Sequence, residues 1–370
     1  MKELILIIGD DIKINRVFLS YLFNTYISKF GSLTDVKFID RSDKDIFKDI
    51  KNLSEEYSYI TIFASNENYP LIAKVLASMN DDFLELKFDD TLAPSLSKKV
   101  DNKSFLITLN KCEINLVEAN PLQKIPNLLI EKSLDEKSFF IYGFDYDESV
   151  NMLNLIANKF DIEISFSRYS KFILIVNAKK RKFSDLDGFI KELKIVFLNR
   201  VIFDESVAEF IVRKLKEKNL KVSFAESCTA GLVASKIGEV SGASEVFDGS
   251  LVTYSNEIKH LWLDVSVNTL NEHGAVSKEC VSEMLSGALK MSGADFSMAV
   301  SGIAGPTGGS ERKPVGTIFI GARDKEKEIV REFHLSGDRN YIREESVNIA
   351  FSLLLEIGNF FEGEMDEKDF

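Results

Sequence analysis

The 370-residue chain is acidic, with 58 Asp and Glu residues against 46 Lys and Arg residues and a formal net charge of −12. Such a charge repels phosphate backbones, so a nucleic-acid partner would require a strong local basic patch. The best candidate, residues 179–182, lies between an apolar run and a helical pattern, where a solvated turn is the simpler interpretation. We therefore expect no nucleic-acid partner. The length of the chain is sufficient for two or three domains.

The cysteine count and the apolar runs point to a cytoplasmic protein. The three cysteines, Cys112, Cys228 and Cys280, are too few and too widely spaced for a disulfide framework or a zinc site. No apolar run approaches the ~20 residues that span a bilayer. The first residues run directly into a strand pattern, without a basic segment or a cleavage site. We expect no membrane partner.

Strand and helix patterns alternate in the first part of the chain. The pattern between residues 10 and 30 is helical, and further helices are expected between and after the next strands. Strands are expected at residues 3–9, 35–40, 59–65, 104–110 and 112–120. Alternation of this kind predicts a parallel sheet covered on both faces. We assign a first domain to residues 1–137.

The order of elements changes after residue 137. A strand, a helix, a hairpin, a second helix and a closing strand are expected at residues 139–144, 147–160, 162–178, 183–199 and 200–203. This order predicts a small α+β domain over residues 138–203. Strands and helices follow again at residues 205–219, 221–225, 249–255, 296–302, 316–335 and 340–361, with a long helix after Ser277. The predicted class is α/β with several domains, the last over residues 204–370.

Residues able to do chemistry concentrate in this last domain. In four places a strand or hairpin ends and small or polar residues follow, at residues 226–231, 254–259, 301–309 and 337–339. In α/β folds, ligands bind where strands end at their carboxyl side, and helix N-termini there bind anions. The sequence therefore predicts a ligand site built from these four segments.

Three small side chains able to act as nucleophiles stand in a row at the first of these strand ends. Ser227 and Thr229 are equally typical of helix caps, for which serine and threonine are favoured. Cys228 could be the nucleophile, or a small buried side chain. The pattern by itself leaves these alternatives open.

A serine nucleophile needs a base. The three histidines, His260, His273 and His334, stand in no recognisable triad pattern. Lys259 follows a strand at the start of the next helix, where burial could hold it neutral, although a solvated surface lysine is the alternative. Tyr254, five residues earlier, could orient the pair or simply pack.

The glycine-rich loop at residues 302–309 and Arg339 are candidates for binding an anion. The loop matches neither a Walker A motif nor a dinucleotide-binding fingerprint. Glycines at this density still let backbone N–H groups converge on an anion, and a plain turn is the alternative. Arg339 could bind a phosphate with two donors, or form a surface salt bridge.

Taken together, the motifs resemble the CinA family. They are "AESCTAG", "YSNEIK", "HGAVS", "SGIAGPTGGS" with "KPVGT", and "SGDR" with "IR", in order and at family-like spacing over about residues 204–361. The carboxy-terminal domain of that family is the nicotinamide mononucleotide amidohydrolase. Residues 138–203 resemble the small KH-like domain of full-length members, and residues 1–137 are similar to their MoaB/MogA-like domain in layout only.

The resemblance implies hydrolysis of nicotinamide mononucleotide to nicotinic acid mononucleotide and ammonia, in pyridine nucleotide salvage. It places the catalytic roles on Ser227, Lys259 and Tyr254. Substrate binding is expected at Thr229, Gly231, Ser301, Gly302, Gly305, Gly308, Gly309 and Arg339. It implies a homodimer, and neither a metal nor an organic cofactor.

The sequence departs from the family in two ways. Ala230 stands where the family usually has a second glycine, and Ser301 where it usually has threonine. In the first domain, residues 63–74 read "FASNENYPLIAK", where family members carry a glycine-rich phosphate loop and paired aspartates. We therefore expect a degenerate scaffold there, without ADP-ribose pyrophosphatase activity.

Two hypotheses for the function follow. One is the amidohydrolase. The other is a non-catalytic nucleotide-binding or regulatory protein linked to competence or the DNA damage response. Retention of Ser227, Lys259, Tyr254 and Arg339 favours the enzyme.

Overall fold

The computed structural model describes residues 2–40, 45–87, 90–131, 136–203, 205–358 and 360. The chain forms two compact units, Met1–Asp135 and Glu136–Phe370. The α/β class with more than one domain is confirmed. Residues 138–203 and 204–370 belong to one unit, so their division into two domains stays a prediction. Asp204, the first residue of the domain predicted over residues 204–370, lies outside the described residues.

The first unit is built on a six-stranded sheet of order β2-β1-β3-β8-β7-β6. Four parallel strands form its larger part: β2 (Asp35–Ile39), β1 (Glu3–Ile8), β3 (Tyr59–Ser65) and β8 (Cys112–Ala119). The antiparallel strands are β7 (Ser104–Leu109) and β6 (Lys99–Asp101), and a separate ribbon joins β4 (Leu84–Leu86) to β5 (Leu92–Pro94).

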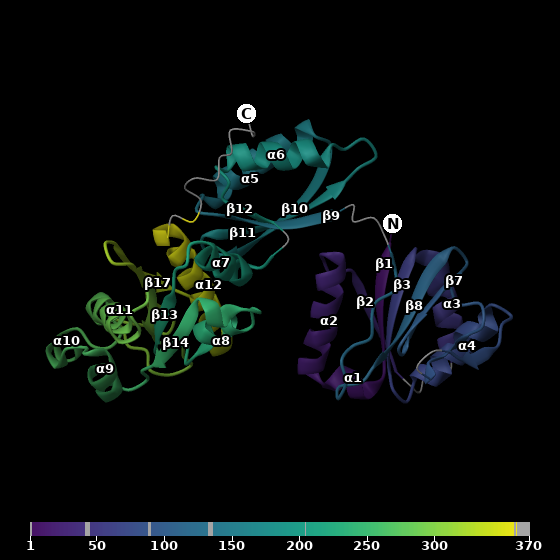
Figure 1. Ribbon diagram of the computed structural model, residues 1–370, viewed down its shortest axis with the longest axis horizontal. Helices are drawn as coiled ribbons and strands as arrows, with labels where there is room; N and C mark the ends of the chain where they lie inside the picture. The colour runs from purple at the N-terminus through teal and green to yellow at the C-terminus, as the bar shows by residue number, and fades with distance from the viewer. Residues whose placement is uncertain are drawn as a thin grey trace. The chain divides into compact units, whose positions relative to one another are not determined.

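Helices cover both faces of this sheet (Figure 1). They are α1 (Asp10–Ile14) and α2 (Arg16–Phe30) on one face, and α3 (Ile46–Glu56) and α4 (Tyr69–Met79) on the other. Alternate residues of β1 pack against the two pairs, Leu4 and Leu6 on α3 and α4, Ile5 and Ile7 on α1 and α2. The single helical pattern over residues 10–30 is broken at Asn15, whose side chain accepts the N–H of Phe18 and begins a new helix.

The second unit begins with a four-stranded antiparallel sheet of order β10-β11-β9-β12. Its elements are β9 (Glu136–Tyr142), α5 (Tyr146–Lys159), β10 (Ile162–Ser170), β11 (Ile173–Lys180), α6 (Leu186–Val196) and β12 (Val201–Phe203). Helices α5 and α6 cover one face. Tyr142, Ile173 and Ile202 share a hydrophobic core with the rest of the unit.

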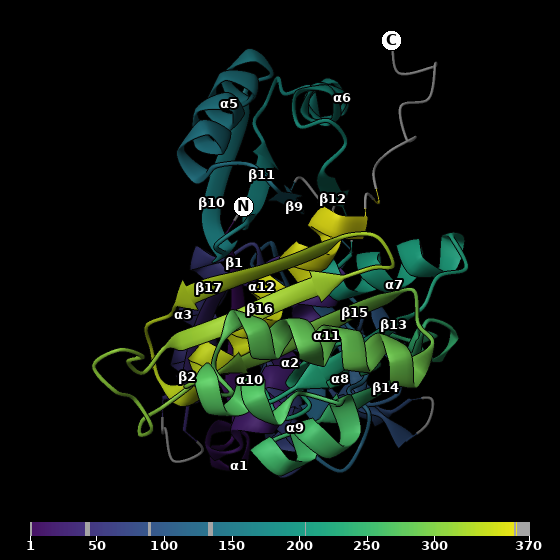
Figure 2. The same ribbon diagram turned by 90° about the vertical axis from the view of Figure 1, so that its left-hand side faces the viewer.

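A five-stranded sheet of order β14-β13-β15-β16-β17 forms the remainder of the second unit. Its strands are β13 (Val222–Glu226), β14 (Phe247–Val252), β15 (Phe296–Gly302), β16 (Thr317–Arg323) and β17 (Glu328–His334). Its helices are α7 (Val207–Glu217), α8 (Leu232–Gly238), α9 (Asn256–Leu263), α10 (Val267–Glu272), α11 (Lys278–Ser292) and α12 (Arg339–Gly358). Figure 2 shows α9, α10 and α11 in front of the sheet, with α7, α8 and α12 behind it.

The register of the three parallel strands positions the site. Glu226 at the end of β13 is paired with Val252 of β14 and Val300 of β15. The segments that follow these strands therefore leave the sheet at the same edge. Across the described part of the chain, no helix is both long enough and apolar enough to cross a membrane.

Candidate active site

The turn at residues 227–231 carries Ser227 away from the end of β13. The N–H of Ser227 donates to Val300 O at 2.9 Å, and the N–H of Ala230 donates to Ser227 O at 3.1 Å. Ala230 has a φ of 51° and Gly231 a φ of 90°, so two consecutive residues are left-handed. Glycine adopts this conformation freely, whereas at Ala230 it costs about 1–2 kcal/mol. The family departure at this position therefore introduces backbone strain.

The side chain of Glu226, and neither that of Ser227 nor that of Thr229, accepts the N–H groups at the start of helix α8 (Leu232–Gly238). This side chain is fully buried and accepts the N–H groups of Val233 and Ala234, each at 3.0 Å. The N-cap residue of α8 is Gly231, and no side-chain bond caps it there. The interpretation of Ser227 and Thr229 as helix caps is therefore wrong. Sequence reasoning missed Glu226.

Lys259 lies against Ser227. Its Nζ is 2.9 Å from Ser227 Oγ, 2.8 Å from Thr253 O and 3.4 Å from Tyr254 O. The side chain of Ser255 caps α9 by accepting the N–H of Ile258, which places Lys259 in the first turn of that helix. The residue is 1% exposed, so the alternative of a solvated surface lysine is wrong.

The surroundings of Lys259 disfavour its charge. No carboxylate among the described residues forms an ion pair with it, and the three oxygens around its Nζ are uncharged groups of the protein. Burial therefore lowers the pKa of Lys259 from its usual value. Such a lysine can give up its proton and act as a base.

Cys228 is a small buried side chain in the core beside α12. It is 5% exposed, and burial raises the pKa of its thiol to about 12. Because the thiolate is the nucleophile, a thiol of this pKa is inert at neutral pH. The backbone N–H groups of Cys228 and Thr229 donate to no other described residue, which leaves two donors beside Ser227.

The loop after β15 is shaped by close packing of its glycines. A Cβ at Gly302 would lie 2.8 Å from both the Cα atom of Ile318 and the carbonyl oxygen of Thr317, and a Cβ at Gly309 would lie 2.8 Å from the backbone nitrogen of Val315. The peptide bond between Gly305 and Pro306 is cis. These contacts explain the need for glycine, while binding of substrate by this loop stays a prediction.

Gly305 and Gly308 of the same loop have left-handed φ values of 81° and 90°. Polar contacts attach the loop to its neighbours. The hydroxyl of Ser301 donates to Ala275 O at 2.7 Å, which attaches the end of β15 to the turn before α11. Lys313, the first residue of the "KPVGT" motif, donates to Val276 O at 2.6 Å.

Arg339 joins two of the other segments. From the first residue of α12 it donates to Gly305 O at 2.7 Å and to the hydroxyl of Tyr254 at 2.8 Å. Tyr254 is 58% exposed, and only its backbone carbonyl reaches Lys259. The structure therefore brings Arg339 and Tyr254 together at the site, with the tyrosine hydroxyl on the arginine. A catalytic role for that hydroxyl stays a prediction.

Arg343, the arginine of the "IR" motif, makes a second contact, and sequence reasoning assigned it no role. It lies one helical turn after Arg339 and donates to Thr229 O at 2.7 Å. Residues four apart share one face of a helix, so the spacing was a usable signal. All four segments that the sequence predicted, at residues 226–231, 254–259, 301–309 and 337–339, therefore meet in one place.

The described residues contain no group of three or more His, Cys, Asp or Glu side chains that could hold a metal. No histidine of the described residues forms a hydrogen bond with Ser227 or Lys259: the Nδ1 atom of His260 is bonded to Val265 O at 2.8 Å, and His273 and His334 lie beside glutamates.

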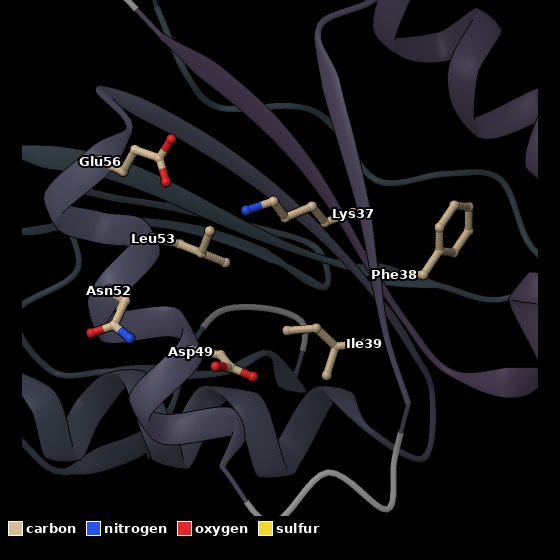
Figure 3. Close-up of a pocket in the computed structure, with 7 residues that line it drawn as sticks. All are labelled: Lys37, Phe38, Ile39, Asp49, Asn52, Leu53 and Glu56. Carbon is tan, nitrogen blue, oxygen red and sulfur yellow. The ribbon is translucent and has the colours of Figure 1, made fainter.

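In the first unit, the segment after β3 forms a tight polar turn. The Nδ2 atom of Asn68 donates to the hydroxyl of Ser65 at 2.7 Å. A cavity of about 460 Å³ lies elsewhere in that unit, between β2 and α3 (Figure 3). It is lined by Lys37, Phe38, Ile39, Asp49, Asn52, Leu53 and Glu56. Its mixed charges form no recognisable phosphate site.

The second unit thus contains an α/β domain in which a serine and a buried lysine meet at the ends of parallel strands. Residues 204–357 match the CinA C-terminal domain family. A CinA-like protein of Thermosipho melanesiensis is 39% identical over 232 residues, which are 62% of this chain and 53% of that protein. A CinA-like protein of Thermotoga maritima is 48% identical over 151 residues, which are 41% of this chain and 37% of that protein.

A solved structure is also similar to the carboxy-terminal part. The crystal structure of the competence/damage inducible protein CihA from Agrobacterium tumefaciens shares 38% identity, with 41% of this chain and 93% of that chain covered and a TM-score of 0.41. Residues 204–357 therefore belong to the CinA C-terminal domain family. The chain spans about half the length, or less, of the curated relatives that it matches.

Proposed function

We propose that the protein hydrolyses the carboxamide of nicotinamide mononucleotide, giving nicotinic acid mononucleotide and ammonia. The observation that carries the proposal is the buried pair of Ser227 Oγ and Lys259 Nζ, 2.9 Å apart, with no ion-pair partner for the lysine among the described residues. The motif resemblance supplies the substrate, and the pair supplies a nucleophile and a base of the kind that amide hydrolysis requires.

In the first step, neutral Lys259 accepts the proton of the Ser227 hydroxyl while Oγ attacks the carboxamide carbon. The two remaining N–H groups of the amine donate to Thr253 O and Tyr254 O, which holds the lone pair toward Ser227. The carbonyl oxygen becomes an oxyanion. The backbone N–H groups of Cys228 and Thr229, which donate to no other described residue, follow Ser227 in the chain and are suited to stabilise it.

In the second step, the tetrahedral intermediate collapses. The ammonium group of Lys259 returns its proton to the leaving nitrogen, the C–N bond breaks, and ammonia departs. The acyl group stays on Ser227 Oγ as an ester. Water then attacks this ester with Lys259 again as base, which releases the carboxylate and restores the serine.

Arg339 is proposed to bind the phosphate of the substrate. Its guanidinium lies on the exposed side of the site and donates to a tyrosine hydroxyl and a backbone carbonyl, both uncharged acceptors. An anionic phosphate is a stronger acceptor for the same donors. We extend the proposal to the first unit, which would bind no pyrophosphate because residues 63–74 lack a glycine-rich loop.

Incubation of the pure protein with nicotinamide mononucleotide tests the proposal. We expect release of ammonia in equal amount to nicotinic acid mononucleotide, and loss of both products in Ser227→Ala. Cys228→Ala is the matched control at the next position and stays active. A protein that binds the nucleotide without releasing ammonia would instead support the regulatory hypothesis. An active Ser227→Ala beside an inactive Cys228→Ala would reverse the nucleophile assignment.

A further inference from the structure

We propose that Arg343 is a positioning residue, which keeps the strained turn at residues 227–231 in its active conformation by holding the carbonyl of Thr229. The proposal rests on the function proposed above. Arg343 then acts on the protein backbone, whereas Arg339 binds the substrate.

The turn needs a stabilising contact from outside because its backbone conformation is unfavourable. Ala230 adopts a φ of 51°, a left-handed conformation that is unfavourable for a residue with a Cβ. Gly231 follows with a φ of 90°, so the chain reverses within two residues. An alanine without support at this place would move toward a right-handed conformation and rotate the peptide groups on either side.

The contact with Arg343 acts on the peptide group that matters. Thr229 O accepts the N–H of Leu232 at 3.2 Å and the guanidinium of Arg343 at 2.7 Å. The second bond is short and charge-assisted, and such bonds are the stronger class. Because this carbonyl belongs to the peptide group between residues 229 and 230, holding its direction restrains ψ of Thr229 and φ of Ala230 together.

The same restraint reaches the proposed oxyanion donors. The N–H groups of Cys228 and Thr229 belong to the two preceding peptide groups of the turn. At the start of the turn, the N–H of Ser227 donates to Val300 O of β15. The turn is thus held at its first residue by the sheet and at its third by α12.

The charge of Arg343 has no competing partner in the described residues. No carboxylate forms an ion pair with it, and its remaining polar contact is Asn340 Oδ1 at 3.4 Å. Its Nε is buried and unpartnered. A surface salt bridge therefore does not explain the residue, whereas the contact with Thr229 does.

The test is a double-mutant cycle between Arg343→Met and Ala230→Gly, measured as ammonia release from nicotinamide mononucleotide. We expect Arg343→Met to lower kcat on the order of 10²-fold with little change in KM, as for displaced catalytic groups. Because glycine removes the strain that Arg343 opposes, adding Ala230→Gly should restore kcat at least about tenfold. Arg343→Lys, which keeps a cation with fewer donors, should lie between.

Two outcomes of the cycle overturn the proposal. One is a double variant no more active than Arg343→Met, because strain is then not what Arg343 opposes. The other is a rise in KM at unchanged kcat, because Arg343 would then bind substrate. Arg331→Met, an arginine on β17 paired with Glu356, controls for the loss of an arginine elsewhere and should leave both constants unchanged.

Amide hydrogen exchange separates this proposal from the function on which it rests. Arg343→Met should speed exchange at the amides of Ala230 and Leu232, and Arg331→Met should not. If the unmodified protein releases no ammonia but exchange rises as expected, the proposed function fails and the hold on the turn stands. If the protein is active and exchange and kcat are both unchanged in Arg343→Met, the positioning role fails.

Discussion

Replacement of Lys259 by arginine and by methionine separates a base from a mere cation. Arginine keeps the positive charge but does not lose its proton in a protein, whereas methionine keeps much of the volume without charge. If Lys259 is the base, both variants should lose on the order of 10²–10⁴-fold in kcat. If it only holds a negative group of the substrate, the arginine variant should keep most of the activity.

The pH dependence follows from the burial of Lys259. Its pKa in the folded protein is lowered, because burial disfavours the charged form. Activity should therefore rise with pH through a value below ~10.4, the ordinary pKa of lysine. The unfolded chain binds this proton more tightly, so the free energy of unfolding also rises with pH between the lowered pKa and ~10.4, by up to about 1.4 kcal/mol per pH unit. Lys259→Met lacks this dependence.

The assay is the initial rate of ammonia release from pH 6 to 10, on the order of one measurement per half unit, with unfolding by urea at the same pH values. The larger arginine has to fit a site that is 1% exposed, so its folding is checked by the same unfolding curves. Lys290→Met, which replaces an exposed lysine of α11, is the control. An active and folded Lys259→Arg, or an acid limb that persists in Lys259→Met, would refute the assignment of Lys259 as base.

Three further predictions concern other parts of the second unit. Arg339→Met should raise KM about tenfold or more with a smaller effect on kcat, and Arg339→Lys should lie between; a fall in kcat alone would contradict phosphate binding. Glu226→Gln should lower the free energy of unfolding by about 1–3 kcal/mol in urea, because one amide oxygen replaces two acceptors for buried N–H groups. Glu239→Gln at the exposed end of the same helix is its control, and equal losses would contradict this. Residues 136–370 alone should fold and keep amidase activity, since they form one compact unit; an inactive but folded fragment would assign the first unit a part in the reaction.

Local patterns in the sequence predicted the principal strands and helices and the four segments of the site, but not the short strands β4, β5 and β6 or the helix α10. The continuous apolar runs of β1 and β3 depend on residues a few positions apart, and so does the start of α12 at Arg339. The break at Asn15 was missed because the apolar spacing continues across it, while the cap that interrupts the helix depends on a single side-chain bond.

The sequence by itself determined which side chains are available: a serine after one buried strand, a lysine after the neighbouring strand, a glycine-rich loop and an arginine. Only the tertiary structure decided what surrounds them. Lys259 and Ser227 are 32 residues apart, and their contact depends on the register of β13 with β14. The burial that lowers the pKa of Lys259 comes from segments distant in the chain. A pKa and a hydrogen-bond partner depend on neighbours in space, which a pattern along the chain does not specify.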